Sequence, residues 1–127
     1  MANSRAKGNK NENEVKEIMQ NAGFFVEKQK AKPRFAKGNT DFFGEFDLIC
    51  VPKITSKHQE QVFIQVRSRK QYGKEKSGVE EFVKETKPTF KAYFSWPEGR
   101  GRNKLWKFEL IKKKGQGCNT FQSQEDW

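Results

Sequence analysis

An aspartate lies inside a nearly continuous apolar run of the chain, Phe46–Val51 (FDLICV). Such a run is typical of a strand that is buried on both faces of a sheet. A carboxylate in this setting is expensive unless it pairs with a cation, caps a turn or binds a metal. Asp47 is therefore either the partner of a nearby Lys or Arg or a residue with a chemical role, and the run itself requires a covered central sheet.

Apolar spacing along the rest of the chain predicts the other elements. Helical periodicity marks residues 10–22 and 77–87, and strand patterns mark 24–30, 46–51, 62–67, 89–96 and 104–112. The resulting order, αβββαββ, predicts an α/β fold with a mixed central β-sheet flanked by helices. We expect a single domain over residues 1–112, a basic arm at 1–9 and a flexible C-terminal tail at 113–127.

The net charge of +10 favours a polyanionic partner, of which nucleic acid is the commonest. A merely solubilising surface is the competing interpretation. The two cysteines lie far apart, and there is no apolar run of membrane-spanning length. We therefore expect a cytoplasmic protein without a membrane partner. The lone histidine, His58, is expected to be an exposed loop residue.

The strand at 62–67 gives Asp47 potential neighbours. Side chains alternate along a strand, so Gln65 and Arg67 share one face. If this strand pairs with the strand at 46–51, both side chains converge on Asp47. Carboxylate, amide and carbonyl oxygens are ligands of hard divalent cations, so such a cluster would be a candidate metal site.

Three segments give the chain a family resemblance: AKGNKNENEVKEIMQNAGFFV, GEFDLICV and FIQVRSRK. With them the chain resembles the PD-(D/E)XK nucleases, in particular archaeal-type Holliday junction resolvases and related phage endonucleases. The likeness covers roughly residues 5–70 and beyond them only the order of elements. It implies a restriction-endonuclease-like core and a prokaryotic or phage-encoded, Mg²⁺- or Mn²⁺-dependent DNA endonuclease. It also implies branched DNA as substrate, a homodimer, and a role in DNA recombination and repair.

The resemblance also implies a helix carboxylate in the metal site. Aligning Lys7-Gly8 and Gly23-Phe24 places it at Glu12, and Glu14 is the alternative. On a helical wheel Glu12 lies closer to the apolar stripe, roughly 70° from its centre against about 90° for Glu14. Both residues are otherwise ordinary carboxylates of a first helical turn, where they complement the helix dipole.

The resemblance assigns the remaining roles with two departures from the family pattern. Asp47 takes the position of the metal-binding aspartate, and the backbone carbonyl of Val66 is a further ligand. Gln65 replaces the second acid and Arg67 the lysine. An amide oxygen can bind Mg²⁺ but lacks the charge of a carboxylate. Arginine stabilises charge but cannot shuttle a proton.

These departures leave three interpretations open: a slower active enzyme, a site completed by the nearby acids Asp41 or Glu45, and a non-catalytic DNA-binding protein on the same fold. An RNA-associated basic protein is a further alternative, but it leaves Asp47 unexplained. Basic residues flank each motif and are expected to hold phosphates without reading sequence. The candidates for DNA binding are Arg5, Lys7, Lys10, Lys30, Arg34, Arg69, Lys70, Arg100 and Arg102.

Overall fold

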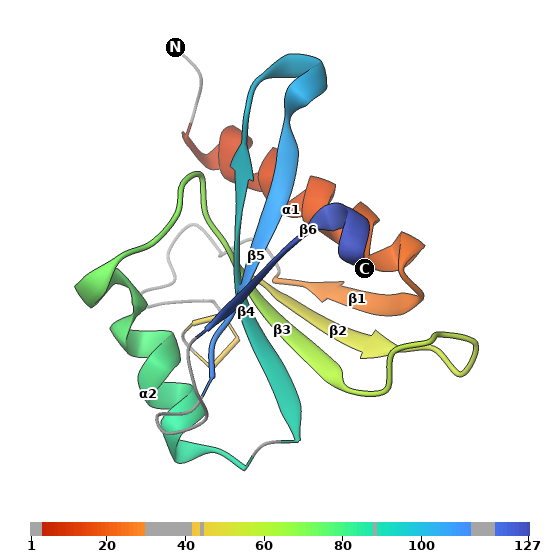
Figure 1. Cartoon of the computed structure of the whole chain (residues 1–127), viewed down its shortest axis with the longest axis vertical. Coiled ribbons are helices and arrows are strands. Elements are labelled where there is room, and N and C mark those ends of the chain that lie inside the picture. The colour runs from red at the N-terminus through yellow and green to blue at the C-terminus, as the bar shows by residue number, and fades with distance from the viewer. Residues whose placement is uncertain (1–3, 30–41, 44, 88, 113–118) are drawn as a thin grey trace, which may run out of the picture.

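The structure, a computed structural model, describes residues 4–29, 42–43, 45–87, 89–112 and 119–127, with the side chains of 4–9 left out. Its elements are α1 (Ser4–Asn21), β1 (Phe24–Lys28), β2 (Leu48–Pro52), β3 (Gln61–Val66), η1 (Gly73–Lys76), α2 (Ser77–Glu85), β4 (Phe90–Glu98), η2 (Gly101–Asn103), β5 (Leu105–Leu110), β6 (Thr120–Ser123) and η3 (Gln124–Asp126). The described strands form one mixed sheet in the order β1-β2-β3-β4-β5-β6 (Figure 1).

The strand directions bring several chain segments to one end of this sheet. Strands β1, β2 and β3 form an antiparallel meander, and α2 then connects β3 to the parallel strand β4. Strands β5 and β6 continue antiparallel. The beginning of β2 therefore lies beside the end of β3, at the same sheet end as the β4–β5 hairpin. This is the end that carries Asp47.

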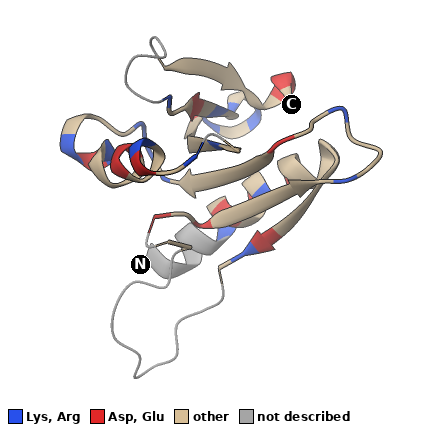
Figure 2. Cartoon of the chain, turned by 90° about the horizontal axis from the view of Figure 1, so that it is seen from below, with Lys and Arg blue, Asp and Glu red and all other residues tan. Residues whose placement is uncertain are grey.

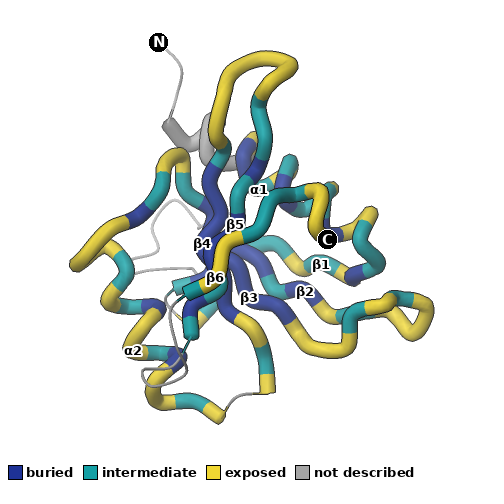
Figure 3. Tube along the Cα trace, viewed as in Figure 1, coloured by how far each residue is buried: buried dark blue, intermediate teal, exposed yellow. Residues whose placement is uncertain are grey.

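The core has two halves, one on each face of the sheet. Helix α1 buries Val15 and Met19 against a cluster that includes Leu48, Ile64 and Phe108. Helix α2 buries Val79 and Val83 on the other face, against a cluster that includes Phe63, Ala92 and Phe94. Because both faces are covered, the central strands are continuously apolar, and Figure 3 shows them as the most buried part of the molecule.

The predicted α/β class, the mixed sheet and the order of the two α-helices and the first five strands are confirmed. The predicted tail is wrong for residues 119–127. Strand β6 pairs with β5, and the ring of Trp127 packs on Phe24, Tyr93 and Phe108. The segment lacks an apolar period because single side chains anchor it. The rest of the predicted tail, 113–118, lies outside the described residues.

The predicted basic arm at 1–9 is also wrong from Ser4 onward, because α1 begins there. Arg5, Ala6 and Lys7 are good helix formers, which offsets the cost of Gly8, about 1 kcal/mol relative to Ala. Among the described residues, no helix combines the length and apolar character needed to cross a membrane.

His58 is not an exposed loop residue. Its ring stacks on Phe24 with centroids 5.0 Å apart and meets Trp127 edge-on at 5.5 Å. Desolvation and the nearby ammonium groups of Lys57 and Lys91 lower the pKa of His58. Burial likewise raises the pKa of the free Cys50 thiol, in the core under α1, to about 12.

Candidate functional site

Strands β2 and β3 separate at Asp47, where side chains replace the backbone ladder. The last backbone bond runs from the Asp47 N–H to the Ile64 carbonyl, at 2.9 Å. Beyond it, the Val66 N–H donates to Asp47 Oδ2 at 2.8 Å, and Gln65 Nε2 donates to the Glu45 carbonyl at 2.8 Å. Asp47 and Gln65 are 6% and 5% exposed. Asp47 and Gln65 therefore lie at the same end of the paired strands β2 and β3, where Asp47 bonds to the residue after Gln65.

The turn before Asp47 is tight and strained. Phe42 and Phe46 pair across it as an isolated bridge, and Phe43 adopts φ 55°, a left-handed conformation that disfavours side chains other than glycine. The ring of Phe43 compensates by packing near Phe63 and Phe82, at centroid distances of 5.7 and 5.1 Å. Strain of this kind persists only where the surroundings enforce it, and it is frequent at functional sites.

Arg67 also converges on Asp47, as predicted. Its Nη1 donates to Asp47 Oδ2 at 3.2 Å and to the Val66 carbonyl at 2.9 Å. The guanidinium therefore lies between the two oxygens predicted to bind a metal, and it supplies the cation that the buried aspartate needs. The Arg67 side chain is 36% exposed, so it can turn outward into solvent.

Gln65 supplies an observation that tests whether these residues fit a divalent cation. Its Oε1 is buried and lacks a hydrogen-bond partner in the part of the chain that the structure describes. Because Nε2 donates to the Glu45 carbonyl, Oε1 must be on the opposite side of the amide. Hard cations such as Mg²⁺ bind amide, carboxylate and carbonyl oxygens. Gln65, Asp47 and the Val66 carbonyl fit such an ion once Arg67 moves outward.

The fit has one clear weakness, the shortage of negative charge. Within the described residues, no group of three or more His, Cys, Asp or Glu side chains could hold a metal ion. Of the two nearby acids proposed to complete the site, Glu45 places its carboxylate against Gly78 in the first turn of α2. The other, Asp41, lies outside the described residues.

The two helix candidates separate clearly in space. Glu12 forms an ion pair with Lys28 at 3.5 Å, and Lys28 is the register partner of Leu48, the residue after Asp47. Glu14 instead pairs with Lys104 at 2.8 Å, beside the β4–β5 hairpin. Glu12 is thus the carboxylate of the two that lies toward the strands of the candidate site.

The predicted phosphate-binding residues are only partly described. Arg5 and Lys7 belong to the beginning of α1, whereas Lys30 and Arg34 lie outside the described residues. Lys10, Arg100 and Arg102 are exposed, and Arg69 is exposed but pairs with Glu75 at 2.7 Å. Figure 2 shows Lys and Arg mainly on the helices and loops, with largely uncharged central strands. Lys70 lies over the rings of Tyr72 and Phe121.

A second buried acid was missed by the sequence reasoning. Glu109 on β5 is 1% exposed, and its Oε2 accepts hydrogen bonds from Lys76 Nζ at 2.7 Å and Asn119 Nδ2 at 2.9 Å. The signal available in the sequence is weak: Glu109 interrupts an apolar stretch between Phe108 and Leu110, but its parity suggested a solvent-facing residue.

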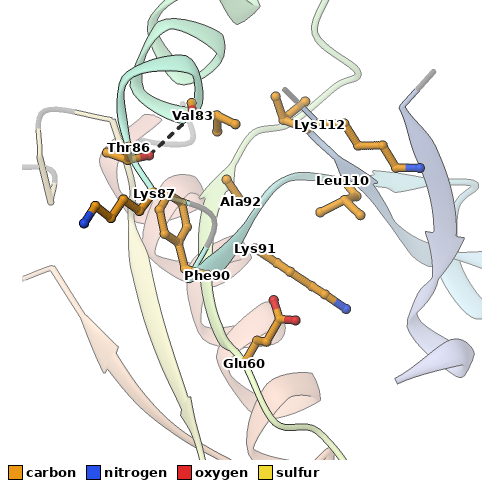
Figure 4. Close-up of a pocket in the computed structure, with 10 residues that line it drawn as sticks. Glu60, Val83, Thr86, Lys87, Phe90, Lys91, Ala92, Leu110 and Lys112 are labelled. Carbon is orange, nitrogen blue, oxygen red and sulfur yellow. Dashed lines mark hydrogen bonds between the residues drawn. The ribbon is translucent and has the colours of Figure 1, made fainter. Parts of the chain in front are cut away.

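A cavity of about 430 Å³ lies away from these groups. Its lining includes Glu60, Lys91 and Lys112 and the apolar side chain of Phe90 (Figure 4). Glu60 precedes β3 and Phe90 begins β4, so the cavity is at the opposite end of the sheet from Asp47. It has no part in the candidate site.

Comparisons with models of known protein families, with curated proteins and with solved structures find no match to this chain.

Proposed function

We propose that this chain is a Mg²⁺- or Mn²⁺-dependent endodeoxyribonuclease that hydrolyses phosphodiester bonds, with a resolvase-like preference for branched DNA. The observation that carries the proposal is Gln65 Oε1, which is buried and has no hydrogen-bond partner among the described residues, at the point near Asp47 where two strands separate. A structural ion pair would account for Asp47 and Arg67, but it would not account for a second buried acceptor next to them. The preference for branched DNA and a homodimeric state rest on the family resemblance.

In this proposal the residues have distinct tasks. Asp47, Gln65 and the Val66 carbonyl would hold the cation, and Glu12 would be a further ligand in place of its ion pair with Lys28. A bound cation would supply positive charge at the attacked phosphate and make water a stronger acid. Arg67 swings away from Asp47 and binds a non-bridging phosphate oxygen, where it stabilises developing charge without moving a proton. The exposed lysines and arginines hold the flanking phosphates.

A second candidate function has its own supporting observation. Arg67 Nη1 lies between Asp47 Oδ2 and the Val66 carbonyl, so it can replace the cation permanently. The chain would then bind DNA on the same scaffold without cutting it.

Incubation with fluorescent four-way junctions, hairpins and linear duplexes, with Mg²⁺, Mn²⁺ or EDTA, separates the two functions. We expect metal-dependent cleavage that is faster on the junction than on the duplex. Binding to all three DNAs without cleavage would contradict the nuclease function and support a non-catalytic DNA-binding protein. Cleavage that survives Asp47→Asn would show that another site is responsible.

A further inference from the structure

Lys70 lies between two exposed aromatic rings that come from distant parts of the sequence. Its Nζ is 5.2 Å from the ring centroid of Tyr72 and 4.8 Å from that of Phe121. Tyr72 is 61% exposed and Phe121 is 55% exposed. We call Lys70, Tyr72 and Phe121 the aromatic clamp.

Hydrogen bonds and ring packing hold the residues around the clamp. The side chain of Gln71, which lies between Lys70 and Tyr72 in the sequence, is buried, and its Nε2 donates to the Arg69 carbonyl at 2.9 Å. Glu75 accepts from the Tyr72 N–H at 3.2 Å. On the other side, the Phe121 ring meets the buried Trp96 edge-on at 6.3 Å. The rings are therefore exposed on a supported backbone, which lowers the entropy cost of a ligand that contacts them.

The clamp lies in the same row of the sheet as the candidate site. Register partners join Gln65 to Phe94, Phe94 to Glu109, and Glu109 to Phe121. Three strand spacings separate the first and last of these residues, a backbone distance of roughly 14 Å. The segment from Arg67 to Tyr72 links the two features directly along the chain.

We infer that the aromatic clamp stacks an unpaired base of a DNA strand whose phosphate lies at the candidate site. This inference rests on the proposed function, because it takes DNA as the ligand. Stacking on aromatic rings is tolerant of sequence and needs exposed, supported ring faces beside a cation. Lys70 serves as that cation and moves from the rings to a phosphate when a base enters. The substrate class is then DNA with unpaired bases close to the cut.

A matched control exists on the other side of the molecule. Phe25 on β1 is 65% exposed, and Lys53 Nζ lies 5.0 Å from its ring centroid. It is a similarly exposed ring with a lysine above it, and among the described residues that lysine contacts no second ring.

The test measures binding of a fluorescent single strand and of a blunt duplex by anisotropy, in EDTA so that no DNA is cut. We expect Tyr72→Leu and Phe121→Leu each to weaken single-strand binding about tenfold, and duplex binding less than about twofold. Lys70→Ala should reduce the salt dependence of single-strand binding by about one counterion. Phe25→Leu should leave both affinities unchanged. A 2-aminopurine base in the strand should lose fluorescence on the wild type and keep more of it on the two clamp variants.

The possible failures are distinguishable. Equal single-strand affinity for wild type and clamp variants overturns the clamp, while metal-dependent cutting of DNA would still support the proposed function. Single-strand binding that depends on the clamp, without cleavage of any DNA in Mg²⁺ or Mn²⁺, would support the clamp and contradict the proposed nuclease activity. If the wild type binds neither DNA, both ideas fail. Equal losses in the Phe25 control also overturn the clamp, since any exposed ring would then suffice.

Discussion

Two buried carboxylates occupy one row of the sheet, and they differ in how their cations are enclosed. Asp47 precedes Leu48, the register partner of Ile64, and the residue after Ile64, Gln65, is connected by register through Phe94 to Glu109. The partner of Glu109, Lys76, has a side chain 18% exposed, whereas Arg67, the partner of Asp47, is 36% exposed. Each site also contains a buried oxygen without a hydrogen-bond partner among the described residues, Gln65 Oε1 and Glu109 Oε1.

The difference separates a structural role from a chemical one. Lys76 joins the beginning of α2 to β5, and Asn119 ties the segment before β6 to the same carboxylate. Moving Lys76 would disconnect two elements. Among the described residues, moving Arg67 would break its bonds to Asp47 and to its neighbour Val66. The Asp47 region is therefore the one that can exchange its cation for a ligand without unfolding.

The sharpest way to break this comparison is to neutralise each acid. Asp47→Asn should lower the cleavage rate by about 1,000-fold, which corresponds to roughly 4 kcal/mol of transition-state stabilisation. The amide oxygen can still accept from the Val66 N–H, so the midpoint of thermal unfolding should change little. Cleavage of a four-way junction under single-turnover conditions and a thermal unfolding curve are the two measurements.

Glu109→Gln should show the opposite behaviour. Loss of the charge leaves Lys76 partly buried without its partner, and we expect a loss of about 3 kcal/mol in the free energy of unfolding. Cleavage per folded molecule should stay within about twofold of wild type, since the described hydrogen-bond partners of the Glu109 carboxylate are Lys76 and Asn119. Urea denaturation gives the stability.

The exposed pair Arg69–Glu75 is the control for Glu109. Glu75→Gln should reduce the free energy of unfolding by less than about 1 kcal/mol, because a solvated ion pair contributes little. A Glu109→Gln protein as stable as this control would contradict the structural role of the Lys76–Glu109 pair.

Gln65→Glu sharpens the chemical side of the comparison. Restoring a second carboxylate should raise Mn²⁺ affinity roughly tenfold, because the charge of the ligands tunes cation binding. Isothermal titration or the electron paramagnetic resonance signal of free Mn²⁺ reports this without any cleavage. Gln61→Glu, at the exposed beginning of the same strand, adds the same charge away from the site. Equal affinities in the two variants would argue against a cation at Gln65.

The smallest effect concerns His58, a third site with a buried unpartnered atom, Nε2, among the described residues. Its lowered pKa means that the unfolded chain binds more protons below about pH 6.5. The free energy of unfolding should therefore fall as the pH drops through 6.5, and level off below the folded pKa. The ammonium groups of Lys57 and Lys91 disfavour the charged ring. Glu60 is the acidic residue that lines the same small cavity as His58. His58→Phe keeps the stacking on Phe24 and should remove this part of the pH dependence; an unchanged profile would assign it to carboxylates.

The sequence predicted the site better than its surroundings. Asp47, Gln65 and Arg67 follow from two strand patterns and the alternation of side chains. The structure bonds Arg67 to Asp47 and places Gln65 at the adjoining end of β3. The contact of Arg67 with the Val66 carbonyl was not predictable, because it depends on a rotamer chosen within the fold. Glu109 was missed because burial from both faces overrides the expectation that a charged strand residue faces solvent.

What the sequence determined by itself is therefore the periodic part of the protein: two helices, five strands, their order, and an aspartate inside a covered sheet. Periodicity is local, so neighbouring residues suffice to reveal it. Only the tertiary structure decided that Phe121 and Trp127 belong to the fold, that Glu12 and Glu14 lie on different flanks of α1, and that Lys70 joins two aromatic rings. Those outcomes depend on single contacts between distant segments, and such contacts leave no periodic pattern in the sequence.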